Sequence, residues 1–307
     1  MGLKYRIIAT CFFLFYALIG AVNASDLTQE PMTLVDSDTQ GSAIDRRIQL
    51  ERKSRDNPFV LTPHRTNYGL VTYTESPNQA PFDEYSTDLQ NVEIKFQLSV
   101  KLQLARSLWK DNGFLYAAYT QKSMWQAFNA EESSPFRDTN HEPEIFLTFL
   151  TNQSLWGVKN RLISFGFNHQ SNGRSGTQSR SWNRLFAEFI LEKDHFYVSV
   201  KPWWRIPEKE KSDPKDATGD DNPDITDYMG HGELMGLYEW HQHRLGIMLR
   251  NNFSKHNYGA VQLDWTFPLR NRVQGYVQYF NGYGETLLDY NYNSNRLGIG
   301  VMFSDWL

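Results

Sequence analysis

Three polar side chains near the ends of two predicted strands are of the types needed for nucleophilic hydrolysis of an ester: His169, Ser171 and Asn183. A serine hydroxyl becomes an effective nucleophile when a base removes its proton, and an imidazole acts as that base when a third group fixes its tautomer. The sequence therefore allows Ser171 as the nucleophile, His169 as the base and Asn183 as the orienting residue. Because a His-x-Ser spacing is common by chance, the competing interpretation is an ordinary polar pair at the edge of a loop.

The strands that must position these residues are indicated by alternation of apolar and polar side chains over residues 160–171 and 182–192. Side chains two apart on a strand point to the same face. His169, Ser171 and Asn183 therefore share their faces with a long apolar series. That series is Ile163, Phe165, Phe167, Leu185, Ala187, Phe189 and Leu191. Polar groups that face hydrocarbon are costly, which favours a functional role for the three polar residues.

The same alternation recurs along the chain, most clearly over residues 92–104. We therefore expect an all-β fold, a transmembrane antiparallel β-barrel of about twelve strands with short periplasmic turns and longer extracellular loops. The alternative is a soluble β-sandwich or lipocalin-like barrel, whose alternating apolar face would point inward. The strands are expected near residues 66–75, 91–105, 113–126, 142–151, 160–171, 182–192, 194–203, 229–241, 243–252, 258–267, 271–281 and 293–304, with long extracellular loops at 127–141, 172–181, 204–228 and 282–292.

The N-terminal residues have the pattern of a secretory signal. Lys4 and Arg6 precede the apolar run 7–21, and small residues follow that permit cleavage after Ala24. The polar residues that come next have no sustained period and are expected to be flexible or loosely docked. The expected division is a signal peptide over residues 1–24, a periplasmic N-terminal segment over residues 25–62 and a transmembrane β-barrel domain over residues 63–307.

Composition excludes two classes of chemistry and partner. The single cysteine, Cys11, lies in the predicted signal peptide, so the mature chain would have neither thiol chemistry nor a disulfide. A net charge of -4 argues against a nucleic-acid surface, which normally has a strong basic excess.

Residues 168–175 and 179–184 closely resemble the signature of the bacterial outer-membrane phospholipase A family. They read Asn-His-Gln-Ser-Asn-Gly-Arg-Ser and Ser-Arg-Ser-Trp-Asn-Arg. Four further blocks resemble the same family in the same order along the chain. They are residues 119–123 (Tyr-Thr-Gln-Lys-Ser), 132–137 (Glu-Ser-Ser-Pro-Phe-Arg), 220–225 (Asp-Asp-Asn-Pro-Asp-Ile) and 282–285 (Gly-Tyr-Gly-Glu). The resemblance covers essentially the whole predicted barrel.

This resemblance implies an enzyme in the bacterial outer membrane, with its active site at the outer leaflet. The implied activity is calcium-dependent hydrolysis of sn-1 and sn-2 acyl esters in phospholipids and lysophospholipids, by a protein that is a homodimer when active and a monomer when resting. On the matching positions, Ser171 is the nucleophile, His169 the base and Asn183 the orienting residue. The backbone N–H of Gly173 matches the oxyanion hole.

The resemblance also implies Ca2+ as a cofactor. The implied ligands are the carbonyl of Arg174, the hydroxyl of Ser179 and the carbonyl of Ser133 of the partner subunit. Carbonyl and hydroxyl oxygens are hard donors of the kind that calcium prefers.

A second calcium position in the family uses two aspartates, of which one matches Asp221. The other position is Gly176 here, so this chain departs from the family pattern. Asp220 and Asp224 are the candidates to compensate. The competing interpretation of this acidic stretch is a solvated surface turn.

Gln121 follows Ala117 and Tyr119 in an alternation that points outward, and it matches a family residue that hydrogen-bonds across the dimer. Because a glutamine in lipid requires a polar partner, this residue is a candidate for the dimer interface. The competing interpretation is a residue that faces the interior of the barrel.

The alternative function is a catalytically inactive barrel that acts as a channel or a structural outer-membrane protein. Gly176 and the terminal Leu307, where such barrels usually end in an aromatic residue, favour it.

Overall fold

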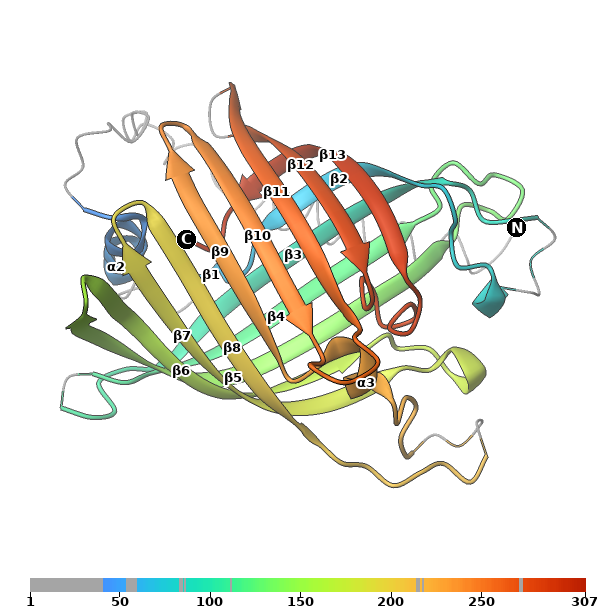
Figure 1. Ribbon diagram of the computed structural model, residues 1–307, viewed down its shortest axis with the longest axis horizontal. Coiled ribbons are helices and arrows are strands. Elements are labelled where there is room, and N and C mark those ends of the chain that lie inside the picture. The colour runs from blue at the N-terminus through green and yellow to red at the C-terminus, as the bar shows by residue number, and fades with distance from the viewer. Residues whose placement is uncertain are drawn as a thin grey trace, which may run out of the picture. The chain divides into compact units, whose positions relative to one another are not determined.

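The computed structural model describes residues 41–53, 60–82, 85, 87–110, 112–213, 216, 218–270 and 273–307 (Figure 1). The predicted signal peptide and the first part of the predicted periplasmic segment lie outside these residues.

Antiparallel pairing closes the sheet into a barrel. Each strand from β2 to β13 pairs with the next along the chain, and β13 pairs back onto β2. Within the described residues, twelve strands thus form a closed antiparallel barrel, as predicted. The strands are β1 (Thr62–Pro63), which pairs only with β3, and β2 (Asn67–Thr74), β3 (Val92–Ala105), β4 (Phe114–Trp125), β5 (Phe136–Leu155), β6 (Val158–Ser171), β7 (Ser181–Lys193), β8 (Phe196–Ile206), β9 (Gly232–Trp240), β10 (His243–Asn251), β11 (Gly259–Arg270), β12 (Val273–Gly282) and β13 (Ser294–Ser304).

The largest difference from the predicted strands is at β5, which begins at Phe136 rather than near residue 142. The loop expected over residues 127–141 is shorter as a result. Arg137 faces the interior in buried ion pairs, while His141 is a polar residue on the outward face. With polar side chains on both faces, this part of the strand has no apolar alternation for the sequence analysis to detect.

Inward-facing side chains are largely charged and paired, whereas outward-facing ones are apolar and exposed. Leu98 and Leu263, for example, are 47% and 46% exposed. This is the reverse of a soluble barrel, whose apolar side chains face inward. The buried ion pairs join Glu93, Arg137, Asp289, Lys95, Glu285 and Arg296 near the extracellular end, and Arg65, Glu142, Glu144, Arg184 and Lys201 farther along the interior, where His64 Nε2 lies 2.8 Å from Glu144 Oε2.

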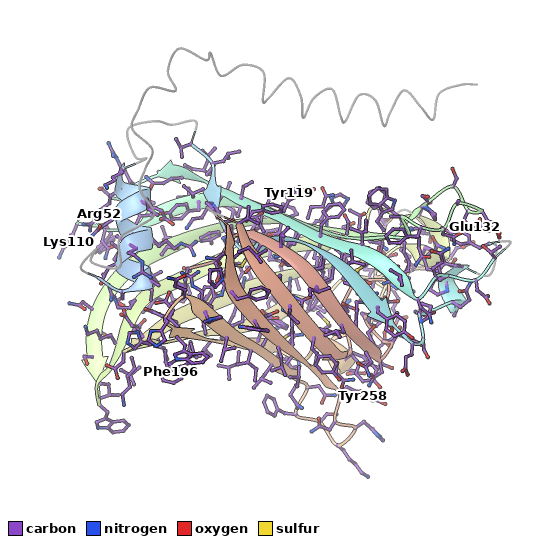
Figure 2. All side chains as sticks on the ribbon, turned by 90° about the horizontal axis from the view of Figure 1, so that it is seen from above. Arg52, Lys110, Tyr119, Glu132, Phe196 and Tyr258 are labelled. Carbon is purple, nitrogen blue, oxygen red and sulfur yellow. The ribbon has the colours of Figure 1, made fainter. Side chains whose placement is uncertain are left out.

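A helix, α2 (Ala43–Lys53), occupies one end of the barrel (Figure 1). Figure 2 shows Arg52 of this helix and Lys110 at one end, and Glu132 at the other. The prediction of a flexible or loosely docked segment is therefore wrong for residues 43–53. Ile44 is fully buried, and polar residues of the helix form ion pairs with strands of the barrel. Among the described residues, no helix is long and apolar enough to cross a membrane.

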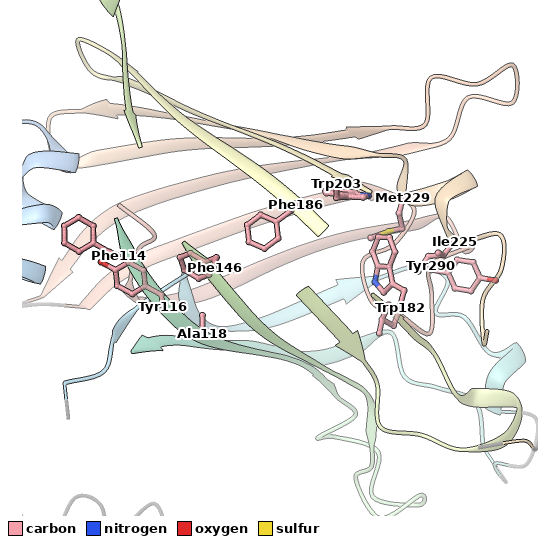
Figure 3. Close-up of a cluster of buried hydrophobic side chains, with 11 residues drawn as sticks. Phe114, Tyr116, Ala118, Phe146, Trp182, Phe186, Trp203, Ile225, Met229 and Tyr290 are labelled. Atoms are coloured by element: carbon pink, nitrogen blue, oxygen red, sulfur yellow. The ribbon is translucent and has the colours of Figure 1, made fainter. Parts of the chain in front are cut away.

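A buried apolar cluster inside the barrel anchors the strand that carries Asn183. Trp182 is fully buried within this cluster (Figure 3). Its Nε1 donates to Gln170 Oε1 at 2.8 Å, and the guanidinium of Arg184 lies 4.0 Å from the centre of its ring. Because successive side chains on a strand point to opposite faces, an inward Trp182 directs Asn183 outward. The cluster comprises Phe114, Tyr116, Ala118, Phe146, Trp182, Phe186, Trp203, Ile225, Met229, Leu287 and Tyr290.

Candidate active site

The predicted catalytic residues lie at the extracellular ends of β6 and β7. His169 is directly opposite Asn183 in the pairing of these strands, and Ser171 is opposite Ser181. Residues of the same parity on β6 are exposed on the barrel exterior: Phe165 is 50% exposed and Phe167 is 37% exposed. The three residues therefore point away from the interior, as predicted.

The orienting pair is formed in the structure. His169 Nδ1 lies 2.8 Å from Asn183 Oδ1, and Asn183 Nδ2 donates to Glu208 Oε1 at 2.9 Å. Because a carboxylate only accepts hydrogen bonds, it takes the amide N–H2 and leaves the amide oxygen facing the imidazole. His169 therefore donates from Nδ1, and Nε2 keeps the lone pair that a general base requires.

Ser171 lies two residues from His169 on the same face, within reach of side-chain contact. Its Oγ accepts a hydrogen bond from the backbone N–H of Gly173 at 3.1 Å. Gly173 has a φ of 63°, a left-handed conformation that glycine adopts without strain. The tight turn after Ser171 thus brings the predicted oxyanion donor next to the predicted nucleophile.

Asn172 holds this turn in place, and the sequence analysis did not identify it. The side chain is buried; its Oδ1 accepts from the N–H groups of Arg174 and Arg180, at 3.3 and 2.9 Å, and its Nδ2 donates to the carbonyl of Gln178 at 2.8 Å. Asparagine commonly forms such bonds to nearby backbone in turns. In the sequence, its place inside the family-like block 168–175 is the one signal that could have pointed to it.

The predicted calcium ligands are only partly brought together. Ser179 Oγ donates to Asp221 Oδ2 at 2.8 Å, so these two oxygens are neighbours. The guanidinium of Arg174 is tied to carbonyls of β5, which fixes the loop that carries its own carbonyl. Ser133 lies on the exposed loop between β4 and β5. Among the described residues, no three His, Cys, Asp or Glu side chains gather as a metal site.

The two aspartates expected to compensate for Gly176 are engaged elsewhere. Both carboxylate oxygens of Asp220 accept from Arg205 at 2.6 Å, and Asp224 accepts from the hydroxyl of Tyr290 at 2.6 Å. Asp221 also forms an ion pair with Lys211. A cavity of about 290 Å3 is lined by Ser179, Asp220, Asp221 and Lys211, among others, but not by Asp224.

Gln121 lies on the outward face of β4, as predicted. It is opposite the exposed Leu98 on one side and His141 on the other, and its Nε2 donates to Ser123 Oγ at 3.2 Å. His141 is in turn opposite Ser171, and its Nδ1 lies 2.6 Å from the hydroxyl of Tyr119. The sequence analysis missed this second histidine because it lies in a stretch interpreted as a loop.

The chain is similar to known proteins over most of its length. The family model for phospholipase A1 matches residues 44–303. Phospholipase A1 of Klebsiella pneumoniae is 39% identical over 302 residues, which cover 98% of this chain and 99% of that protein. Phospholipase A1 of Escherichia coli K12 is 41% identical over 268 residues, 87% of this chain and 88% of that protein.

Two solved structures have the same fold at similar identity. The Salmonella typhi outer membrane phospholipase dimer with bound calcium gives a TM-score of 0.75 at 41% identity, covering 82% of this chain and 95% of that chain. The outer membrane phospholipase A of Escherichia coli gives a TM-score of 0.75 at 41% identity, covering 81% of this chain and 100% of that chain.

Proposed function

Because the chain belongs to the phospholipase A1 family, we propose that it is a calcium-dependent hydrolase of phospholipids and lysophospholipids in the bacterial outer membrane, acting on sn-1 and sn-2 acyl esters. The observation that carries the proposal is the hydrogen-bonded pair of His169 and Asn183 beside Ser171, on the exterior of the barrel. A triad inside a closed barrel would be out of reach of lipids.

In the proposed reaction, Ser171 Oγ attacks the ester carbonyl carbon while its proton passes to Nε2 of His169. The bond from this carbon to the glycerol oxygen breaks, His169 returns the proton to that oxygen, and the acyl group remains on Ser171. Water, deprotonated by His169, then attacks the acyl carbon. The bond from this carbon to Ser171 Oγ breaks, His169 returns the proton to Oγ, and the fatty acid leaves. Support for Gly173 as the oxyanion donor is the short distance from its N–H to Ser171 Oγ.

The donor set fits a hard cation. Ser179 Oγ and Asp221 Oδ2 are 2.8 Å apart, and the carbonyl of Arg174 and the carbonyl of Ser133 of the partner subunit are the further candidate ligands. Calcium, when bound, would supply positive charge beside the developing oxyanion.

The acyl chains of the substrate would lie along the apolar exterior next to Ser171. Phe165, Phe167 and Leu185 are exposed there, and no separate pocket for the chains is needed. Ester groups of a bilayer lie near its interface, at the level of the strand ends. We further propose that the active form is a homodimer and the resting form a monomer, with Gln121 at the interface.

Fatty-acid release from phospholipid in mixed micelles tests this function. Ser171→Ala should lower kcat at least about 1000-fold, because the nucleophile is lost. Ser175→Ala is the matched control, since Ser175 is an exposed serine of the same loop, and it should retain activity. Removal of calcium by a chelator should abolish turnover and calcium should restore it. Normal turnover by Ser171→Ala would refute the role of Ser171 as the nucleophile. Full activity in excess chelator would refute the dependence on calcium.

A further inference from the structure

The carboxylate of Glu208 lies directly behind the pair of His169 and Asn183. Three groups follow one another: Glu208 Oε1 accepts from Asn183 Nδ2 at 2.9 Å, and Asn183 Oδ1 lies 2.8 Å from His169 Nδ1. We propose that Glu208 is a positioning residue for the catalytic histidine, which it orients and supports through the amide of Asn183. This inference rests on the proposed hydrolase function.

The backbone explains why Glu208 reaches Asn183. Ile206, the last residue of β8, is the cross-strand partner of Asn183, so the loop that follows begins beside the triad. Figure 1 shows that β8 and the loop between β6 and β7 meet at the same end of the barrel. Glu208, two residues beyond Ile206, therefore folds back onto the orienting residue.

An amide by itself fixes a histidine tautomer poorly. If the side chain of Asn183 turned over, its N–H2 would face His169 Nδ1, and the imidazole would have to accept there and carry its proton on Nε2. That tautomer has no lone pair on Nε2 to receive the proton of Ser171. Glu208 accepts hydrogen bonds only, so it holds the amide in the productive orientation.

Glu208 also adds charge that an amide lacks. When His169 takes the proton of Ser171 it becomes an imidazolium. The carboxylate of Glu208, on the far side of Asn183, stabilises that charge. The cations nearby are committed to other carboxylates: Arg205 binds Asp220, and Lys211 pairs with Asp221. In the part of the chain that the structure describes, neither forms an ion pair with Glu208.

The first test replaces the carboxylate by an amide of the same shape. Glu208→Gln should lower kcat about tenfold with little change in KM, because orientation and charge support are lost while substrate contacts remain. The matched control is Asp216→Asn, which removes the same charge from an exposed residue of the same loop and should change neither quantity.

A second variant separates this role from a purely structural one. In Asn183→Asp, a carboxylate faces His169 directly and stands against Glu208, so the two negative charges oppose each other. Adding Glu208→Gln to this background should then raise kcat, whereas it lowers kcat in the natural chain. Circular dichroism reports whether each variant is folded. If Glu208→Gln alone folds poorly, the direction of the change in kcat within the Asn183→Asp background still tests the proposal.

Two results would overturn the proposal: a Glu208→Gln variant with the kcat of the natural chain, or the same loss of kcat in both backgrounds. Failure of the proposed function is a separate outcome, recognised by the absence of fatty-acid release from the natural chain or by its persistence in Ser171→Ala.

Discussion

At the scale of single residues, the carboxylate of Asp221 contacts both Lys211 and Ser179, of which Ser179 is an expected calcium ligand. Its Oδ1 pairs with Lys211, and its Oδ2 accepts from the hydroxyls of Ser179 and Ser181 at 2.8 and 3.2 Å. A calcium ion that binds Asp221 must displace the ammonium group or share the carboxylate with it. Lys211 would therefore compete with a calcium ion for the carboxylate of Asp221.

Removing this competitor should strengthen calcium binding. In Lys211→Met we expect the calcium concentration for half-maximal activity to fall about threefold to tenfold, because Asp221 loses its cation and gains affinity for another. Titration of fatty-acid release with calcium measures this. Lys209→Met, an exposed lysine of the same loop, is the control and should leave the titration unchanged. An unchanged titration in Lys211→Met would show that Asp221 takes no part in calcium binding.

Sequence reasoning predicted the three residues of the proposed triad but not Glu208, and the reason is physical. His169, Ser171 and Asn183 lie on strands, where the two-residue period specifies the face of each side chain. Glu208 lies in a loop without a period, and its place beside Asn183 depends on the pairing of β7 with β8. Lys211 reaches Asp221 in the same loop, and no spacing in the sequence indicates that contact.

At the scale of elements, α2 is a helix that depends on the barrel around it. Its first turn is capped by Ser42, whose Oγ accepts from the N–H of Asp45 at 3.2 Å, while Asp45 accepts from the N–H of Ser42 at 3.2 Å. Its polar side chains then pair with strands, as Glu51 does with Lys101 at 2.6 Å. The sequence analysis predicted no structure for this segment, because the charge partners of the helix come from distant strands.

Acid should therefore release α2 from the barrel. Burial raises the pKa of Glu51, but Lys101 and Arg47 lower it more, to about 2. Burial likewise raises the pKa of Asp45, and Arg161 contributes to the net lowering. Groups with a lowered folded pKa stabilise docking above the ordinary carboxyl pKa of 4.5 for Glu51, and this stabilisation is lost as pH falls toward about 2.

A spin label at position 52, introduced as Arg52→Cys, reports the docking of α2. Its spectrum should be immobile near neutral pH and become mobile between about pH 4.5 and 2. Adding Glu51→Gln should make the label more mobile at neutral pH, since the bond to Lys101 loses its charge. A label that stays equally immobile over this range would contradict the role of the ion pairs.

At the scale of the whole molecule, the barrel separates charge from catalysis. Its interior is crossed by buried ion pairs, which gives no support to a function as a channel, and the proposed active site lies on its exterior. One row of outward residues runs across four neighbouring strands: Leu98, Gln121, His141 and Ser171 are successive cross-strand partners. With strands about 4.8 Å apart, Gln121 lies about 10 Å from Ser171. A second copy docked on Gln121 would therefore form one wall of the active site.

This geometry predicts that activity depends on meeting a second copy. Fatty-acid release per molecule should rise with protein concentration in detergent, and Gln121→Leu should require about threefold more protein for the same rate, the effect of losing one weak polar contact within the membrane. Asn281→Leu is the matched control, because Asn281 is an exposed amide residue on β12, and it should behave like the natural chain. A rate per molecule that does not change on dilution would exclude the dimer as the active form. Identical curves for the natural chain and Gln121→Leu would instead remove Gln121 from the interface.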